Sequence, residues 1–264
     1  MKRTGRIHLC HALSAGLAAL MLFALHPCVA RAQREKATQN FLQANQAYEN
    51  ERYADAASLY EEVIGCGFHS GAIYYNLGNC STKMGRIGPA LAYYRNAERF
   101  MPRDGDLRFN LRYVLDQRKD RIETRERIPF ARVFFFWYYW LSIREILVIF
   151  LVFNLLLWTL SLILLYRHHE LLRWARILSL CLFLVFGATL VVKAYAQGII
   201  RQGVVTVQEA TVRSGNGIHH SPLFILHEGA ECRVDDEAEG WMKIRLTDGK
   251  IGWIPSSAIR VIGQ

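Results

Sequence analysis

The chain of 264 residues has few of the residues that break or cross-link a fold: six prolines, nineteen glycines and six cysteines. So little proline and glycine excludes a fibrous or low-complexity protein, and a hydrophobic share of 52% excludes a disordered one. The sequence also has no Cys-x-x-Cys pair, phosphate-binding glycine loop, His-Glu-x-x-His or nucleophile elbow. We therefore predict a non-enzymatic protein with no catalytic residues, no cofactor and no metal site.

Strong charge of one sign is also missing from the segments that are polar enough to be soluble. The net charge of +9 reduces to +2 over residues 33–128 and −1 over residues 199–264. The rest of the positive charge flanks the apolar runs, so the chain lacks the basic surface that nucleic-acid binding requires. The sequence predicts a membrane protein without a nucleic-acid partner.

Residues 1–32 have the three zones of a secretory signal peptide. A basic start is followed by the uncharged apolar run Leu9–Leu25 and then by the small residues Ala30 and Ala32. An uncleaved N-terminal anchor is the alternative. Either way, the residues that follow are expected outside the cytoplasm.

Two later apolar runs are long enough to cross a bilayer core of about 30 Å. We predict transmembrane helices over 146–166 and 174–196, with Lys193 snorkelling toward the headgroups. An aromatic-rich stretch within 129–145 predicts an interfacial segment before the first span. Because the link between the spans is short, they form a hairpin. Both soluble domains then lie on the extracytoplasmic (periplasmic) side of a bacterial inner membrane.

The first soluble segment contains an internal repeat with an offset of 34 residues. Asn45 recurs as Asn79, and Tyr60 recurs as Tyr94. The pattern of small residues, a buried tyrosine and a helix-ending Pro102 is similar to the tetratricopeptide repeat. The expected boundaries are 33–128 for an all-α repeat domain, about 37–70 and 71–104 for its two repeats, and 106–127 for a capping helix.

The first helix of each repeat is expected to line a concave groove that binds protein partners. Asparagines beside aromatic rings suit an extended peptide, because amides bond its backbone and rings contact its side chains. Some of these aromatics can equally be core residues. The candidate groove residues are Phe41, Asn45, Tyr48, Tyr75, Asn76, Asn79, Lys83, Phe109, Asn110 and Tyr113.

After residue 198 the pattern changes to short alternating apolar stretches with turn signals, which predicts a small all-β domain over 199–264. The block Val212-Arg213-Ser214-Gly215 and the later block Asp248-Gly249 to Ile254 resemble the bacterial SH3-like (SH3b) barrel. We expect Trp241 and Trp253 to supply much of its core.

The order of these parts resembles the aerotolerance-associated BatE family over nearly all of 33–264. The resemblance implies a multi-domain membrane scaffold, with tetratricopeptide repeats, a two-helix transmembrane hairpin and an SH3-like barrel. It also implies partners: membrane proteins with von Willebrand factor A domains and a MoxR-type AAA ATPase, in an envelope stress or aerotolerance complex.

Two other hypotheses remain open. In the first, the SH3-like domain recognises cell-wall peptide and the repeats are a spacer. In the second, a hidden enzyme uses Cys66 or the histidines, although no base with its own orienting partner can be named for that thiol.

Overall fold

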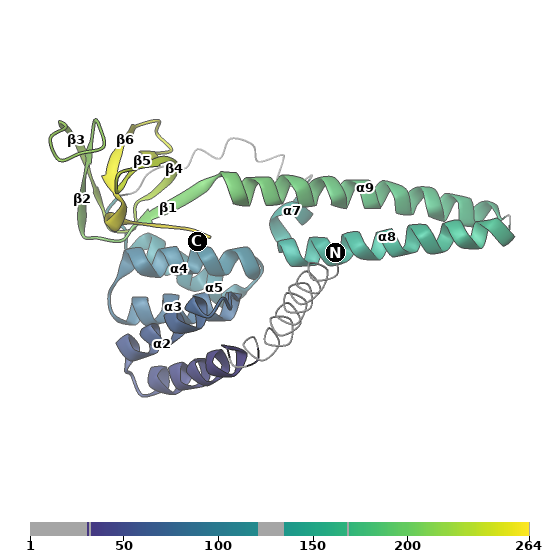
Figure 1. Cartoon of the computed structure of the whole chain (residues 1–264), viewed down its shortest axis with the longest axis horizontal. Coiled ribbons are helices and arrows are strands. Elements are labelled where there is room, and N and C mark those ends of the chain that lie inside the picture. Colours follow the sequence, from purple (N-terminus) through teal and green to yellow (C-terminus); the bar gives the residue numbers. More distant parts are fainter. Residues whose placement is uncertain (1–30, 32, 121–134, 168, 264) are drawn as a thin grey trace, which may run out of the picture. The chain divides into compact units, whose positions relative to one another are not determined.

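The computed structural model describes residues 31, 33–120, 135–167 and 169–263 (Figure 1). Among these described residues, those up to His69 form one unit, and those from Ser70 onward form a second. The predicted signal peptide falls almost wholly outside the described residues and stays a prediction.

The first unit contains a pair of helices, made by residues 33–49 and by α2 (Tyr53–Gly65). Glu51, in the short turn between them, adopts a left-handed conformation with φ of 59°. The side-chain amide of Asn40, in the middle of the first helix, donates a hydrogen bond of 2.8 Å to Glu62, whereas Asn45, further along that helix, bonds the earlier α2 residue Tyr60. The two helices therefore run antiparallel.

The second unit begins with another helix pair, α3 (Gly71–Lys83) and α4 (Ile87–Phe100). Gly78 lets them pack closely, because a Cβ at this position would lie only 2.3 Å from ring carbon Cε1 of Tyr94. Tyr94 is fully buried in this contact. The helix pairs occupy the two segments for which repeats were predicted, and within each pair the two helices contact one another.

A single helix, α5 (Gly105–Asp116), follows the second pair. Its N-cap is Asp104, whose carboxylate accepts a hydrogen bond of 2.8 Å from the backbone N–H of Leu107.

The predicted capping helix 106–127 is longer than the helix in the structure, which ends at Asp116. Residues 117–120 are not helical, and 121–127 lie outside the described residues. The physical reason lies in residues 118–120, whose side chains bond to the β-strands described below.

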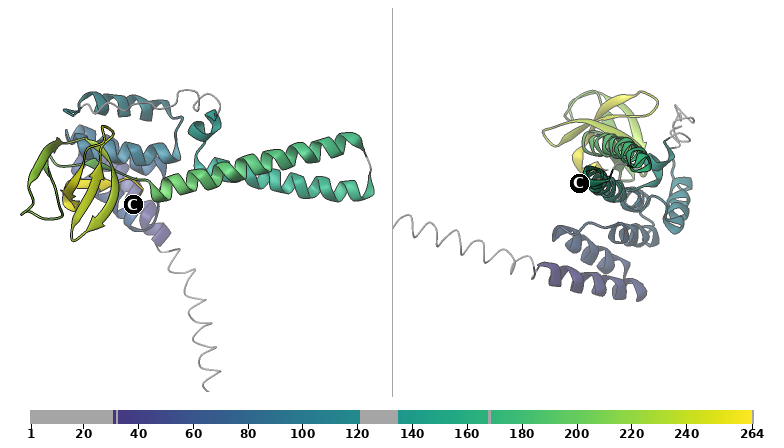
Figure 2. Two further views of the ribbon diagram at one scale, coloured as in Figure 1. Left: turned by 90° about the horizontal axis from the view of Figure 1, so that it is seen from above. Right: turned by 90° about the vertical axis from the view of Figure 1, so that its right-hand side faces the viewer.

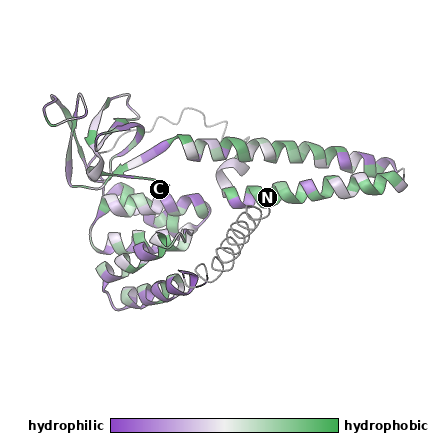
Figure 3. Cartoon of the chain, viewed as in Figure 1, coloured by the Kyte–Doolittle hydropathy of each residue, from purple (hydrophilic) through white to green (hydrophobic). Residues whose placement is uncertain are grey.

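Two helices, α8 (Ile143–Tyr166) and α9 (Glu170–Ile199), are long and apolar enough to cross a membrane. They contain the predicted spans 146–166 and 174–196 and extend beyond them. The two helices lie side by side in Figures 1 and 2, and Figure 3 shows that most of their residues are hydrophobic. Their side chains are mostly exposed, so they are unlike the core helices of a soluble domain.

Aromatic stacking joins α8 to α9. Phe150 stacks on Phe183 with ring centroids 4.7 Å apart, and Phe153 stacks on Phe186 at 5.9 Å. The hydroxyl of Ser179 also donates a hydrogen bond of 3.2 Å to the backbone carbonyl of Phe153. A hydrogen bond of this kind suits packed helices in an apolar environment.

Residues 201–261 form one antiparallel sheet of seven strands, called here the β-domain. The strands are β1 (Arg201–Val205), β2 (Glu209–Arg213), β3 (Pro222–His227), β4 (Glu231–Ala238), β5 (Trp241–Arg245), β6 (Ile251–Pro255) and β7 (Ile259–Val261). Their order in the sheet is β3-β2-β6-β5-β4-β1-β7, so β3 and β7 are the edges. A short 3-10 turn, Ser256–Ala258, precedes β7.

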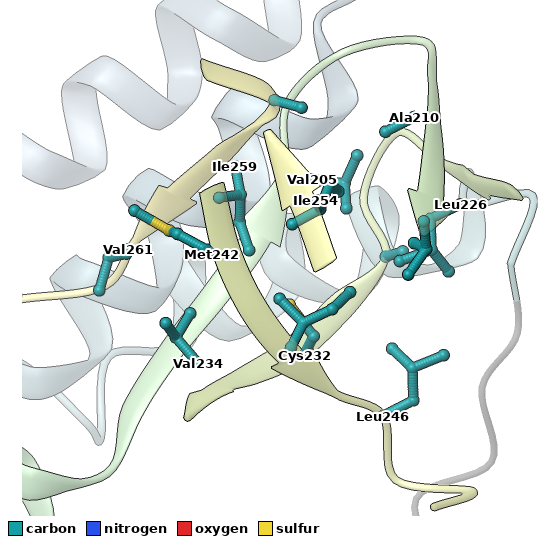
Figure 4. Close-up of a cluster of buried hydrophobic side chains, with 14 residues drawn as sticks. Val205, Ala210, Leu226, Cys232, Val234, Met242, Leu246, Ile254, Ile259 and Val261 are labelled. Atoms are coloured by element: carbon teal, nitrogen blue, oxygen red, sulfur yellow. The ribbon is translucent and has the colours of Figure 1, made fainter. Parts of the chain in front are cut away.

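The core of the β-domain is mostly aliphatic, as Figure 4 shows. Met242, Ile244 and Ile254 point into it, and side chains alternate along a strand. Trp241 and Trp253, each one position away, therefore face out of the cluster and are half-buried. The expectation that these two tryptophans supply the core is wrong.

Candidate functional site

The two helix pairs contain the same side-chain hydrogen bond. Tyr60 donates its hydroxyl hydrogen to the side-chain oxygen of Asn45 at 2.5 Å, and Tyr94 does the same to Asn79 at 2.7 Å. Both partners of the second bond lie 34 positions after those of the first. The carbonyl oxygens of these two asparagines, which sequence reasoning assigned to a bound peptide, thus bond within their own helix pair.

Asn110 of α5 links two of the predicted groove residues of α3. Its side-chain amide donates to the oxygen of Asn79 at 3.0 Å and to the hydroxyl of Tyr75 at 3.1 Å. Asn76 is half-buried on the same helix, α3. The structure therefore brings Tyr75, Asn79 and Asn110 together as one amide and hydroxyl cluster.

Phe109 and Tyr113 are the most exposed aromatic side chains of this region. They lie four residues apart on α5 and are 65% and 51% exposed. They occupy the positions equivalent to Tyr75 and Asn79, one repeat length further on. Lys83 is exposed at the end of α3. We call Tyr75, Asn79, Lys83, Phe109 and Tyr113 the α3–α5 surface, and it can contact an apolar side chain and a polar backbone together.

The other predicted groove residues belong to the first unit and pack inside it. The ring of Phe41 lies 5.8 Å from that of Tyr60, and the ring of Tyr48 lies 5.3 Å from that of Tyr53. Phe41 and Tyr48 are both half-buried. Their contacts are those of core residues, which was the alternative to a groove.

Sequence reasoning missed a second site, where α4 contacts the β-domain. The guanidinium of Arg95 donates to both carboxylate oxygens of Glu231 at 2.7 and 3.3 Å, and also bonds Glu98 at 2.9 Å. Arg118 bonds the same Glu231 carboxylate at 3.0 Å. Burial lowers the pKa of Arg95, but the two carboxylates more than offset this, so its pKa lies above the ordinary arginine value. The arginine stays charged in this contact.

The first turn of α4 touches the β-domain through its backbone. Glu228 accepts a hydrogen bond of 2.9 Å from the N–H of Gly88, one of the N–H groups that have no partner within a helix. A Cβ on Gly88 would lie 2.3 Å from the carbonyl oxygen of Val205 and 2.9 Å from the Cα of Thr206. Only glycine fits here.

The segment after α5 contacts the edge strand β3. The carboxylate of Asp120 accepts the backbone N–H of His227 at 2.7 Å and lies 2.9 Å from its ring Nδ1. Lys119 lies 2.8 Å from the other ring nitrogen. This pairing covers one end of an edge that would otherwise present unpaired backbone groups.

A last pair of contacts joins α4 to the end of the chain. The side-chain oxygen of Asn96 accepts the N–H of Gly263 at 2.7 Å, and the guanidinium of Arg260 lies 4.5 Å from the ring centre of Tyr93. We call all these contacts, from Gly88 to Gly263, the docking contact. In the sequence, this contact is indicated by Gly88, because a glycine inside the first turn of a helix can mark close approach of another backbone.

The thiols offer little nucleophilic chemistry in the described part of the chain. Burial raises the pKa of Cys80 to about 11 and that of Cys232 to about 12, so both are neutral thiols at pH 7. Cys66 is half-buried and Cys181 is exposed on α9, and all four are free. Among described residues, no group of three or more histidine, cysteine or acidic side chains could hold a metal ion.

The α3–α5 surface and the docking contact are thus two candidate sites among the described residues of the second unit. Comparison with protein-family models gives no matching family, and comparison with curated proteins gives no match either.

Proposed function

We propose that the chain is a membrane-anchored, non-enzymatic scaffold that binds protein partners on the extracytoplasmic side of a bacterial inner membrane. In this proposal the helix pairs are tetratricopeptide repeats and the β-domain is an SH3-like barrel. The observation that carries it is the α3–α5 surface, where Phe109 and Tyr113 stay exposed beside an ordered amide cluster. Such a surface suits an extended peptide segment of a partner.

The docking contact supports a scaffold in which the repeats and the β-domain act together. Residues on both sides of the two spans bond one another, as Arg95 does with Glu231. In this proposal both soluble segments lie on the same side of the membrane, as expected for a hairpin. A β-domain held in this way is less suited to act as an independent module on a flexible spacer.

The resemblance to the BatE family extends the proposal to particular partners. We expect membrane proteins with von Willebrand factor A domains, and a MoxR-type AAA ATPase system, in an envelope stress or aerotolerance complex. The export signal predicted for residues 1–32 gives the side of the membrane.

Replacing Phe109 and Tyr113 together by alanine tests the function. Because both side chains are exposed, we expect the free energy of unfolding to change by less than about 0.5 kcal/mol for each. We expect partner capture to fall by about tenfold or more, as for loss of aromatic anchors worth ~1–2 kcal/mol. Crosslinked purification of the full-length chain from its native membrane, followed by mass spectrometry, measures capture.

Ile218→Ala, which removes a side chain that is 70% exposed on the β-domain, is the matched control and should leave capture unchanged. The pair Asn45→Ala and Asn79→Ala is a poorer test, because both asparagines accept tyrosine hydroxyls inside the repeats. Undiminished capture by the Phe109 and Tyr113 variant contradicts the groove. Retention of cell-wall fragments alone by that variant favours wall recognition by the β-domain.

Three variants that each retain a single cysteine test the side of the membrane. In intact cells with a permeable outer layer, a membrane-impermeant maleimide should label Cys66, which is half-buried. Cys80 and Cys232 should react only after unfolding, because burial raises their pKa to about 11 and about 12 and shields the sulfur atoms. Mass shift on a gel measures labelling.

The signs of these two shifts also predict a pH dependence. The pKa of each thiol is higher in the folded chain than in the unfolded chain, where it is near 9. Both thiols therefore contribute fully to the free energy of unfolding below about pH 9, and this contribution is lost as the pH rises toward the pKa values of the folded chain. Labelling of both buried thiols, which requires unfolding, should therefore increase as the pH rises from about 9 toward the folded pKa values. Failure of Cys66 to react from outside, with labelling after lysis, places the repeats in the cytoplasm.

A further inference from the structure

The short helix α7 (Phe136–Trp140) precedes α8 and consists only of aromatic residues. Its Trp137 and Tyr138 side chains are half-buried, whereas Phe136, Tyr139 and Trp140 are 54%, 45% and 60% exposed. The helix therefore has an inner side that packs and an outer side made of three large aromatic rings.

The inner side of α7 is attached to the last turns of α9. The indole N–H of Trp137 donates to the hydroxyl of Thr189 at 3.3 Å. The ammonium of Lys193 donates to the backbone carbonyl of Tyr138 at 2.7 Å and to that of Leu141. The same ammonium lies 5.2 Å from the ring centre of Tyr138.

The ammonium of Lys193 therefore bonds backbone carbonyls at α7, and its predicted snorkelling toward the headgroups stays a prediction. Only 8% of its surface is exposed, although it lies in an apolar helix. Its ammonium reaches the carbonyl groups that a helix leaves without partners at its C-terminus. The lysine gains the hydrogen bonds that a buried cation needs, and α7 is fixed at the height of this turn of α9.

The start of α8 places charged groups next to α7. Ser142 and Glu145 form a capping box at the N-terminus of α8. Glu145 also pairs with Arg103, which follows α4, and Arg144 lies 5.4 Å from the ring centre of Phe100. Exposed aromatic rings beside charged side chains are typical of the depth at which lipid headgroups meet acyl chains.

We propose that α7 lies in the headgroup region of the bilayer, with Phe136, Tyr139 and Trp140 against lipid, and that Lys193 sets its depth. The lipid contact continues the exposed apolar surface of α8 and α9. This inference rests on the proposed membrane anchoring. It adds a third lipid-contacting element to the two spans and gives the buried lysine a positioning role.

Depth-dependent quenching of tryptophan fluorescence tests the proposal. The full-length chain is reconstituted in vesicles of phosphatidylcholine and phosphatidylglycerol, with bromine atoms placed either high or low on the acyl chains. Three versions keep one tryptophan each, at Trp140, Trp158 or Trp241, with phenylalanine at the other positions. We expect shallow bromines to quench Trp140 at least about twofold more than deep ones, as for an interfacial ring.

The other two tryptophans separate failure of this inference from failure of the anchoring. Trp158 lies within α8 and is 69% exposed, so deep bromines should quench it more strongly; Trp241 lies in β5 and should not be quenched. Quenching of Trp158 without quenching of Trp140 overturns the placement of α7 and leaves the spans in the membrane. Absence of quenching at both positions overturns the anchoring as well.

The role of the lysine is tested in the version that keeps Trp140. Lys193→Met removes the ammonium but keeps an unbranched apolar side chain, so the ratio of shallow to deep quenching should change. Arg173→Met removes an exposed cation from the other end of α9 and should leave the ratio unchanged. An unchanged ratio in Lys193→Met overturns its role in setting the depth.

Discussion

Replacing Tyr94 by alanine is expected to lower the free energy of unfolding of the helical region by about 3–5 kcal/mol. The ring is fully buried between α3 and α4, where it fills the space that Gly78 leaves open. Its hydroxyl also donates to Asn79 at 2.7 Å and lies 3.1 Å from the hydroxyl of Thr82. Truncation leaves a cavity and also removes a hydrogen-bond donor from Asn79.

Thermal unfolding of the purified full-length chain in detergent, followed by circular dichroism, measures this effect. Tyr94→Phe keeps the ring and should cost only about 1 kcal/mol, since it removes the hydroxyl alone. Tyr113→Ala is the matched control, because that side chain is 51% exposed on the neighbouring helix α5. If Tyr94→Ala unfolds at the same temperature as the control, the ring does not hold the pair together.

Placing a methyl group on Gly88 is expected to separate α4 from the β-domain. The new Cβ would meet the backbone of Val205 and Thr206 at 2.3 and 2.9 Å, and neither atom can turn away as a flexible side chain can. Overpacking of this kind costs about 1–3 kcal/mol. Replacing glycine by alanine in a helix interior gains no more than roughly 1 kcal/mol in helix propensity, so we expect a net loss of stability. The strain is relieved if the β-domain moves off.

Hydrogen–deuterium exchange of the full-length chain reports this separation directly. The backbone N–H groups of His227 and Gly263 bond the side chains of Asp120 and Asn96 across the docking contact. Both should exchange faster in Gly88→Ala. Gly105→Ala makes the same change in the first turn of α5, where no atom lies within 4 Å of the new Cβ, and should leave both rates unaltered.

Glu231→Gln provides an independent test of the same contact. It leaves Arg95 and Arg118 without their shared carboxylate while preserving the shape of the side chain. Because these groups are partly exposed, we expect a smaller acceleration than for Gly88→Ala, equivalent to about 0.5–1 kcal/mol. Unchanged exchange in both variants means that the docking contact does not persist in solution.

The parts of the fold that sequence reasoning located are those set by local periodicity. The offset of 34 residues placed both helix pairs, and the absence of charge placed α8 and α9, because each signal acts within a few turns of helix. The predicted helix end at residue 127 was wrong because residues 118–120 bond the β-domain instead of continuing the helix. Such tertiary contacts override helix propensity and leave no local pattern.

The candidate site was predictable only in part for the same reason. The positions of Tyr75, Asn79 and Asn110 follow from the repeat, and the structure brings them together. That Asn45 and Asn79 accept tyrosine hydroxyls depends on side-chain geometry across a helix pair. The burial of Lys193 and the pairing of Arg95 with Glu231 depend on segments far apart in sequence, where any of many charges could be the partner.

The separation between Arg95 and Glu231 has a consequence for how the protein is made. The two residues are 136 positions apart, and α8 and α9 are synthesised between them. At a rate of synthesis of ~5–20 residues per second, β4 with Glu231 is made on the order of ten seconds after α4. A chain that stops before β1 leaves the face of α4 around Arg95 uncovered, so an unfinished product differs from the complete one by an exposed surface on a helix that is synthesised early.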